Sequence, residues 1–436
     1  MRPPLLTLLG LGLCLGCLLP AACEAPTPPR TPPPRLVFSD APPALPNPAI
    51  DTPPKILKTD EAAKATLLIQ AGPSPILETA LKELDARSPA LWTRLALQRY
   101  HSRKSSGSGF VIAGTQAGGS RILTNAHVAS PYWELSGRIP GQDKPLPLRL
   151  IHQDEANDIA VLATAEPLPG LVLAPEAPSF RAEIYAAGFP ALGGKPSYQE
   201  TVGNVSNPCV DFPQLAGTRT CLLQHTASVD PGSSGGPLIQ KSDHTVVGMN
   251  AGIATGRHNV FLAVRFDAIH TAIAKATEIE TAIAARKAPP GFDIACRNVV
   301  ATIHLFAAML KDTLQEAPQK RLSFFQLFRP HPLFLAAALK HSQPDPAGDV
   351  PALLMMNQFD YFMAFMATGE RWAYLFDRGA ALPQIGGVGC GDPPSLSFQN
   401  PGEPVGSVRL KDEQGRFFIL SMAWTHAAWH ILSMER

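Results

Sequence analysis

Three short polar stretches of this 436-residue sequence carry side chains that together could break an acyl bond. His127 lies in "LTNAHV", Asp158 in "NDIAVL" and Ser234 in "GSSGGP". Acyl transfer needs a nucleophilic hydroxyl, an imidazole that takes its proton, and a carboxylate that orients the imidazole. We therefore predict that His127 is the general base, Asp158 its partner and Ser234 the nucleophile.

Glycines surround the serine in "DPGSSGGPLI", which runs from Asp230 to Ile239. Gly232 allows a sharp turn, after which its N–H and the N–H of Ser234 can face the same point. Two such donors form an oxyanion hole, and each typically stabilises the transition state by about 3–4 kcal/mol. We predict that this loop is rich in glycine because backbone N–H groups bind the developing negative charge there.

The region around these motifs, from Ser105 to about Phe266, alternates short apolar runs with glycine and proline turns. This alternation of short apolar runs and turns is typical of a β-barrel or β-sandwich. A helix closes the region, because Ile269, Ile273 and Ala276 share one helical face. The fold class is therefore mainly β.

The flanking regions differ in character. Residues 57–103 are predicted to be a helical N-terminal extension, because Leu77, Leu81 and Leu84 follow one another at helical spacing. Residues 289–436 are predicted to form a separate α+β region, helix-like over 296–341 and with aromatic strands such as "GRFFILSMAW" further on. The pattern assigns no known fold to this C-terminal region.

The motifs resemble those of chymotrypsin-like serine proteases, and "SGSGFVI", "TNAHV", "NDIAVL" and "DPGSSGGPLIQ" are particularly similar to the HtrA (Deg) branch. The resemblance covers roughly residues 104–275 and implies two six-stranded β-barrels with the triad between them, in a protease domain over 104–288. It also implies that the nucleophile is the serine directly before Gly-Gly-Pro, which is Ser234. Ser233 is then expected to be a turn residue that faces solvent. No PDZ domain follows, so the peptide tethering of that branch is not carried over.

Two other functions compete with a serine endopeptidase. Gly232–Gly236 also satisfies the G-x-S-x-G pattern of α/β-hydrolases, but that fold requires a helix after the serine and a later acid and histidine. Here Pro237 and an apolar run follow, which indicate another strand. A catalytically silent binding protein with the protease fold is the other alternative, although such proteins usually lose a member of the triad.

The resemblance also suggests a substrate pocket. Its floor falls on Ser228, six residues before the nucleophile, and its walls on Asn250, Ala251 and Gly252, with Ala263 nearby. These residues are small and uncharged, and a cation buried without a partner is costly. We expect cleavage after small or medium aliphatic residues rather than after Lys or Arg, with an acidic preference second because His225 is near.

Seven cysteines occur, at positions 14, 17, 23, 209, 221, 296 and 390. The last four allow three pairings. Cys209 and Cys221 flank a stretch of turn residues between two expected strands, so we predict that they pair, which leaves Cys296 and Cys390 to pair within the C-terminal region. The histidines and cysteines show no metal-binding spacing, and we predict neither a metal nor an organic cofactor.

The N-terminus is typical of an exported protein. Residues 1–23 combine Arg2 with a short apolar run, as in a signal peptide, and two cysteine boxes leave a lipid anchor and a plain cleaved signal as alternatives. Residues 24–56 are so rich in proline that an extended linker is expected. The net charge of +1 gives no electrostatic basis for binding nucleic acid. We predict a periplasmic or cell-envelope protein that acts on peptides or proteins.

Overall fold

Only part of the chain is described by the structure, which is a computed structural model. The described residues are 62–87, 98, 101, 104–113, 119–129, 132–142, 144–211, 221–253, 259–300, 331–333, 336, 390, 394–400, 403–411 and 417–435. The predicted signal peptide, the predicted linker and most of the helix-like segment 296–341 lie outside these residues. Within the described residues, no helix is both long and apolar enough to span a bilayer.

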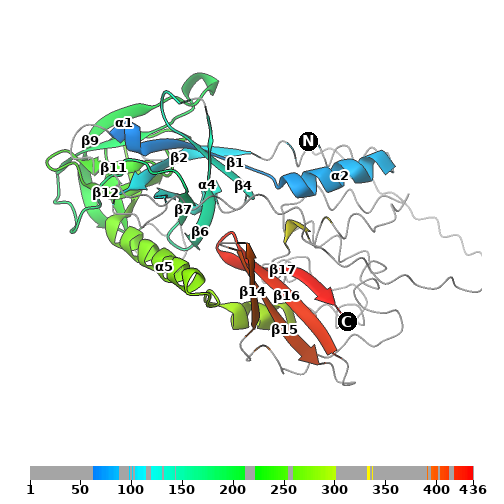
Figure 1. Ribbon diagram of the computed structural model, residues 1–436. Helices are drawn as coiled ribbons and strands as arrows, with labels where there is room; N and C mark the ends of the chain where they lie inside the picture. The colour runs from blue at the N-terminus through cyan, green and yellow to red at the C-terminus, as the bar shows by residue number, and fades with distance from the viewer. Residues whose placement is uncertain are drawn as a thin grey trace, which may run out of the picture. The chain divides into compact units, whose positions relative to one another are not determined.

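The first sheet has seven antiparallel strands in the order β5-β4-β1-β2-β3-β7-β6 (Figure 1). β-Branched and leucine side chains fill its strands, as in "SRILT" and "IAVLAT", and their burial builds the main core. The strands are β1 (Thr66–Gly72), β2 (Ser105–Ile112), β3 (Ser120–Thr124), β4 (Glu134–Arg138), β5 (Leu146–Pro147), β6 (Arg149–Asp154) and β7 (Ile159–Thr164).

The second group of strands closes into a six-stranded barrel in the order β10-β13-β12-β11-β8-β9. Its interior is a separate apolar cluster that includes Ile184, Leu223 and Leu238. The strands are β8 (Glu183–Gly188), β9 (Gln199–Val210), β10 (Leu222–His225), β11 (Pro237–Gln240), β12 (Val246–Ile253) and β13 (Phe261–Arg265). The predicted mainly β fold is confirmed, and the second barrel has the six strands expected, whereas the first sheet has seven.

The helical prediction for 57–103 is wrong in part. Residues Thr66–Gly72 form β1, which lies between β2 and β4 and so belongs to the first sheet. Alternate residues of "TLLIQAG" are buried, and this period of two is the strand signal. The leucines at helical spacing belong instead to α2 (Pro75–Arg87), where Leu77, Leu81 and Leu84 are all buried. The short helix α1 (Ala62–Ala65) precedes β1.

The predicted closing helix is α5 (Phe266–Ala284), which contacts β6, β7, β12 and β13. Its buried residues include Ile269 and Ala276, while Ile273 is partly buried against the same core. Arg121 of β3 reaches this helix, where it donates to Thr277 Oγ1 at 2.9 Å and pairs with Glu280.

The C-terminal sheet has four antiparallel strands, β14 (Ser395–Asn400), β15 (Glu403–Lys411), β16 (Phe417–Thr425) and β17 (Ala428–Glu435), in that order (Figure 1). The aromatic stretches that predicted strands here form β16 and β17. The indole of Trp429 packs edge-on against Phe292, with ring centroids 4.8 Å apart. Phe292 lies shortly after α5, so this contact connects the sheet to the segment that follows the second barrel.

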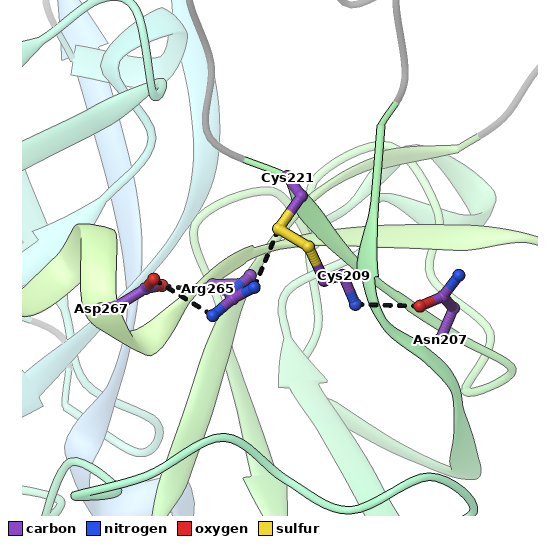
Figure 2. The surroundings of a disulfide bond; sticks show 5 residues. All are labelled: Asn207, Cys209, Cys221, Arg265 and Asp267. Atoms are coloured by element: carbon purple, nitrogen blue, oxygen red, sulfur yellow. Dashed lines mark hydrogen bonds and ion pairs between the residues drawn. A yellow bond between two sulfur atoms is a disulfide. The ribbon is translucent and has the colours of Figure 1, made fainter.

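Both predicted disulfides are present, Cys209–Cys221 and Cys296–Cys390. Figure 2 shows that Arg265 lies beside the first of them, with Nη1 2.8 Å from the sulfur of Cys221. The same guanidinium donates twice to the carboxylate of Asp267, at 3.1 Å each. This bridge is thereby linked to the end of β13 and the first turn of α5.

A tryptophan surrounded by histidines joins the C-terminal sheet to the segment before β4. The rings of His331, His426 and His430 lie 5.5, 4.3 and 5.0 Å from the ring of Trp133, centroid to centroid. His426 Nε2–H donates to the Trp133 carbonyl at 2.9 Å. His426 is half-buried, and the burial of its imidazole lowers its pKa to about 4. The pKa of His331 is lowered to about 3, first by burial and then by the nearby charge of His426.

The first disulfide should stabilise the second barrel. Replacing Cys209 and Cys221 together by serine should lower the free energy of unfolding by about 3 kcal/mol, because the bridge spans 12 residues and limits the entropy of the unfolded chain. The matched Cys296/Cys390 double variant should lose more, about 5 kcal/mol, because that bridge spans 94 residues. Urea unfolding without reductant measures both. Equal losses, or free thiols at these positions in a non-reducing peptide digest, would contradict this expectation.

The histidines around Trp133 should make stability depend on pH. The folded-state pKa of His426 lies below its ordinary value of 6.5, so the unfolded chain binds more protons as the pH falls from about 6.5 to about 4. Stability is therefore lost across this window. His426→Asn removes the titrating group and keeps a residue that tolerates the positive φ of 48° found there. Its free energy of unfolding should fall less between pH 7 and pH 4.5 than that of the wild type, and an identical fall would refute the assignment.

Candidate active site

His127 and Asp158 form a close pair within the first sheet. His127 lies on the short helix α4 (Ala126–Ala129) just after β3, and Asp158 directly precedes β7. His127 Nδ1 lies 2.8 Å from Asp158 Oδ2 and 3.0 Å from Oδ1, and the His127 N–H also donates to Oδ1 at 3.0 Å. An ionised carboxylate only accepts hydrogen bonds, so Nδ1 carries the proton. In the neutral ring Nε2 is then left as a proton acceptor.

The backbone at Asp158 is held in an uncommon conformation. Its φ is 58°, in the left-handed region that aspartate and asparagine tolerate better than most residues. Asn125 supports it, because its side-chain N–H donates to the Asp158 carbonyl at 2.9 Å. Asn125 is fully buried and lies two residues before His127. It therefore links the segment that carries His127 to the backbone of Asp158.

The loop before Ser234 forms a type II turn. The Ser233 N–H donates to the Asp230 carbonyl at 2.9 Å, Pro231 occupies the second position and Gly232 the third, with φ of 104°. A side chain at position 232 would also collide with the chain after β8, because an added Cβ would lie 2.5 Å from the Phe189 carbonyl oxygen. Glycine is thus required at 232 by conformation and by space.

The directions of the two predicted oxyanion donors, the N–H groups of Gly232 and Ser234, follow from the hydrogen bonds that hold the carbonyls of the same peptides. In a trans peptide the N–H and C=O point in opposite directions. The Pro231 carbonyl accepts from Ala191 N–H at 3.1 Å and the Ser233 carbonyl from Gly236 N–H at 3.0 Å. The N–H groups of Gly232 and Ser234 point away from those bonds, and among the described residues neither of them donates a hydrogen bond.

The two neighbouring serines differ in their surroundings. Ser233 does not face solvent as expected. It is 6% exposed, and its hydroxyl accepts from the Asp230 N–H at 3.3 Å, which closes the turn. Ser234 is half-buried. No hydrogen bond joins Ser234 to His127 within the described part of the chain, so the structure pairs two members of the predicted triad and places the third on an adjoining loop.

Gly107 of β2 lies where the two halves of the site adjoin. A Cβ at this position would lie 2.8 Å from Val128 Cγ2 and 3.1 Å from the carbonyl oxygen of Ser234. Val128 directly follows His127 on α4. The absence of a side chain at 107 therefore allows the loop of Ser234 to lie against the helix that carries the histidine.

The predicted pocket residues do not gather around one cavity. Ser228 lines a small pocket beside the nucleophile loop, and its carbonyl accepts from Thr201. The walls of that pocket come from β8, β9 and the turn: Ala186, Ala187, Gly188, Pro190, Gln199, Thr201, Val229, Asp230 and Ser233.

The other four predicted pocket residues lie on β12 and β13. Asn250 is 1% exposed and joins the loop through its backbone, donating to Gly236 and accepting from Gly235. Ala263 is its partner on β13 and is buried, while Ala251 and Gly252 are half-buried beside a break in the strand register. His225 is fully buried on β10, packed near Phe261, and burial lowers its pKa to about 4. It does not line the pocket.

Sequence reasoning missed two residues that shape the site, Asn125 and Ser108. Both lie within short motifs already singled out, Asn125 in "TNAHV" and Ser108 in "SGSGFVI", and their place in these motifs was the available signal. Among the described residues, no group of three His, Cys, Asp or Glu side chains is arranged to hold a metal ion.

The match to a known family coincides with this site. Residues 107–249 match the family model described as "Trypsin-like peptidase domain". Residues 107–249 are thus similar to this family, and His127, Asp158 and the glycine-rich loop all lie within the matched stretch. The two relatives described next are named as an HTRA2 serine protease and a probable DegP-like serine endoprotease.

One relative is the mitochondrial serine protease HTRA2 of Bos taurus, 34% identical over 149 residues, which are 34% of this chain and 31% of the relative. Another is a probable periplasmic DegP-like serine endoprotease of Hahella chejuensis, 28% identical over 258 residues, 58% of this chain and 48% of the relative. The chain thus spans about a third to a half of their lengths. Among solved structures, an active-form protease of M. tuberculosis is 21% identical with a TM-score of 0.37, covering 53% of this chain and 93% of its own.

Proposed function

We propose that this protein is a serine endopeptidase that hydrolyses peptide bonds through an acyl-enzyme intermediate. The observation that carries the proposal is the His127–Asp158 pair, with Nδ1 2.8 Å from the carboxylate, in a trypsin-like peptidase domain whose glycine-rich loop presents Ser234. Serine, imidazole and carboxylate are the three groups that this reaction requires.

In the proposed mechanism, Ser234 Oγ attacks the substrate carbonyl carbon while its proton passes to His127 Nε2. Asp158 accepts the Nδ1–H hydrogen bond and stabilises the imidazolium that forms. The N–H groups of Gly232 and Ser234 bind the oxyanion of the tetrahedral intermediate. The imidazolium then protonates the leaving amine, the C–N bond breaks, and a water molecule activated by His127 hydrolyses the acyl-enzyme.

The two alternatives have less support. An α/β-hydrolase requires a helix directly after the serine, whereas Pro237–Gln240 form strand β11 here. A silent binding protein would not need the Asp158 carboxylate bonded to His127 or the two N–H groups left without acceptors. This second alternative remains an outcome of the experiment below.

We also propose that the protein acts outside the cytoplasm on peptide or protein substrates. Two disulfides support an oxidising compartment, and the apolar N-terminal run supports export. A lipid anchor and a plain cleaved signal stay alternatives, and no cofactor is included in the proposal.

Substitution of the two serines should separate an enzyme from a scaffold. Ser234→Ala should abolish casein hydrolysis and fluorophosphonate labelling, because it removes the nucleophile. Ser233→Ala is the matched control: it removes a neighbouring hydroxyl that accepts one hydrogen bond in the turn, and substantial activity should remain. Full activity or labelling in the Ser234 variant would overturn the mechanism. A wild type that neither hydrolyses nor labels would favour the silent binding protein.

The specificity prediction can be tested on the same preparations. We expect cleavage after small or medium aliphatic residues, because the pocket at Ser228 is lined by uncharged and mostly small residues with the exception of Asp230. Asp230 is the one carboxylate lining the described pocket, and it is exposed in the turn, where water screens it. Mass spectrometry of a digested peptide library measures the preference. A dominant preference for Lys or Arg would contradict the predicted specificity. A preference for acidic residues would favour the second expectation, in which His225 contributes to specificity.

A further inference from the structure

Ser108 of β2 makes hydrogen bonds to both halves of the candidate site. It is fully buried, and it lies in the first sheet opposite Leu68 of β1. Its backbone N–H donates to the Ser234 carbonyl at 2.7 Å. Its backbone carbonyl accepts from the Thr124 hydroxyl at 2.6 Å, three residues before His127. One residue thus contacts both the nucleophile and the strand end that leads to the general base.

The hydroxyl of Ser108 contacts the loop of the second barrel. Ser108 Oγ lies 2.7 Å from the Gly232 carbonyl oxygen and 2.8 Å from Phe189 N. The Phe189 N–H can only donate and the Gly232 carbonyl can only accept. The hydroxyl proton must therefore point at Gly232, so the direction of both bonds is fixed.

The peptide held in this way lies between the two oxyanion donors. The carbonyl of Pro231 before it is held by Ala191, and the carbonyl of Ser233 after it by Gly236. The middle carbonyl, of Gly232, is held by Ser108. With all three carbonyls hydrogen-bonded, none of the three planar peptides is free to rotate about the Cα bonds that join them. The Gly232 and Ser234 N–H groups, which belong to the outer two peptides, are therefore held at a fixed angle.

The space around the hydroxyl is matched to this role. A Cβ at Gly188 would lie 2.8 Å from Ser108 Oγ and 3.1 Å from the Ser233 Cα. The end of β8, the turn and the serine hydroxyl are therefore packed against one another with room only for glycine. A rotation of the Ser108 side chain away from Gly232 would leave both of its partners unpaired.

We propose that Ser108 is a positioning residue that sets the geometry of the oxyanion hole through the Gly232 carbonyl. This inference rests on the proposed peptidase function. Ser108 touches neither the substrate nor the reacting atoms. It acts on catalysis by holding the donors at the angle that the tetrahedral intermediate needs.

The test compares two buried serines of the same sheet. Ser120 on β3 is 2% exposed, and its hydroxyl accepts from Leu168 N–H at 2.7 Å, at the opposite end of β3 from Thr124. Ser108→Ala and Ser120→Ala therefore remove the same hydroxyl at similar burial. Ser108→Ala should lower kcat about ten- to a hundredfold, the effect of leaving a carbonyl unpaired, while KM changes less than about threefold. Ser120→Ala should keep wild-type kcat once both variants are compared below their melting temperatures.

A second measurement does not depend on activity. Amide hydrogen exchange at Ser233, Gly235 and Gly236 should be faster in Ser108→Ala and unchanged in Ser120→Ala. Unchanged exchange there, or a kcat loss equal in the two variants, would overturn the positioning role. If the wild type proves inactive while Ser108→Ala still speeds hydrogen exchange at these amides, the peptidase proposal fails. The proposal that Ser108 holds this loop in place then stands. Should Ser108→Ala not fold, Ser108→Cys, whose thiol donates only weakly, serves the same comparison with a smaller expected loss.

Discussion

The candidate site depends on the contact between the first sheet and the second barrel. His127 and Asp158 belong to the first sheet, whereas Ser234 and both oxyanion donors belong to the second barrel. The second barrel has an apolar cluster of its own, but Tyr185, Met249 and Val264 of this barrel belong to the same cluster as the first sheet. This shared burial holds the two together, but it is non-directional and does not set the orientation of the reacting groups. The hydrogen bonds from Ser108 to Gly232 and Ser234, at 2.7 Å each, supply that directional constraint.

Within the first sheet, the orientation of His127 is strongly determined. The carboxylate of Asp158 receives both the side-chain and the backbone N–H of this histidine, and Asn125 holds the Asp158 carbonyl. Because the imidazole has a single partner on its Nδ1 side, its tautomer follows from the chemistry of that partner. The backbone at Asp158 is held in the left-handed region, a conformation that persists because the surrounding contacts determine it.

Much of this could be predicted from the sequence. The short apolar runs predicted the strands, and the cysteine spacing predicted both disulfides. The glycines around Ser234 predicted a backbone-lined loop, since only glycine fits the turn at 232. Residues 66–72 were assigned wrongly, because the helical spacing of the leucines in α2 was extended to the strand before it. This strand has only seven residues, and its partners β2 and β4 are distant in sequence.

The contacts between distant segments could not be predicted. The role of Ser108 depends on two residues more than 80 positions away, and no local pattern records such a contact. The pocket residues were transferred from the family resemblance by their distance in sequence from Ser234, and in the structure Asn250, Ala251, Gly252 and Ala263 lie on β12 and β13, whereas Ser228 lies in a loop. Ser233 was expected to face solvent because turns usually do, but this turn is covered by the chain that follows β8.

The burial of β2 has a consequence for how the site would fail on heating. Six of its eight residues are buried, and backbone in such a central strand opens only when the whole sheet does. The part of the oxyanion geometry that Ser108 fixes is therefore tied to the cooperative unfolding of the sheet. Loss of catalysis and loss of secondary structure should then follow one common temperature curve, and the site would not melt as an isolated loop.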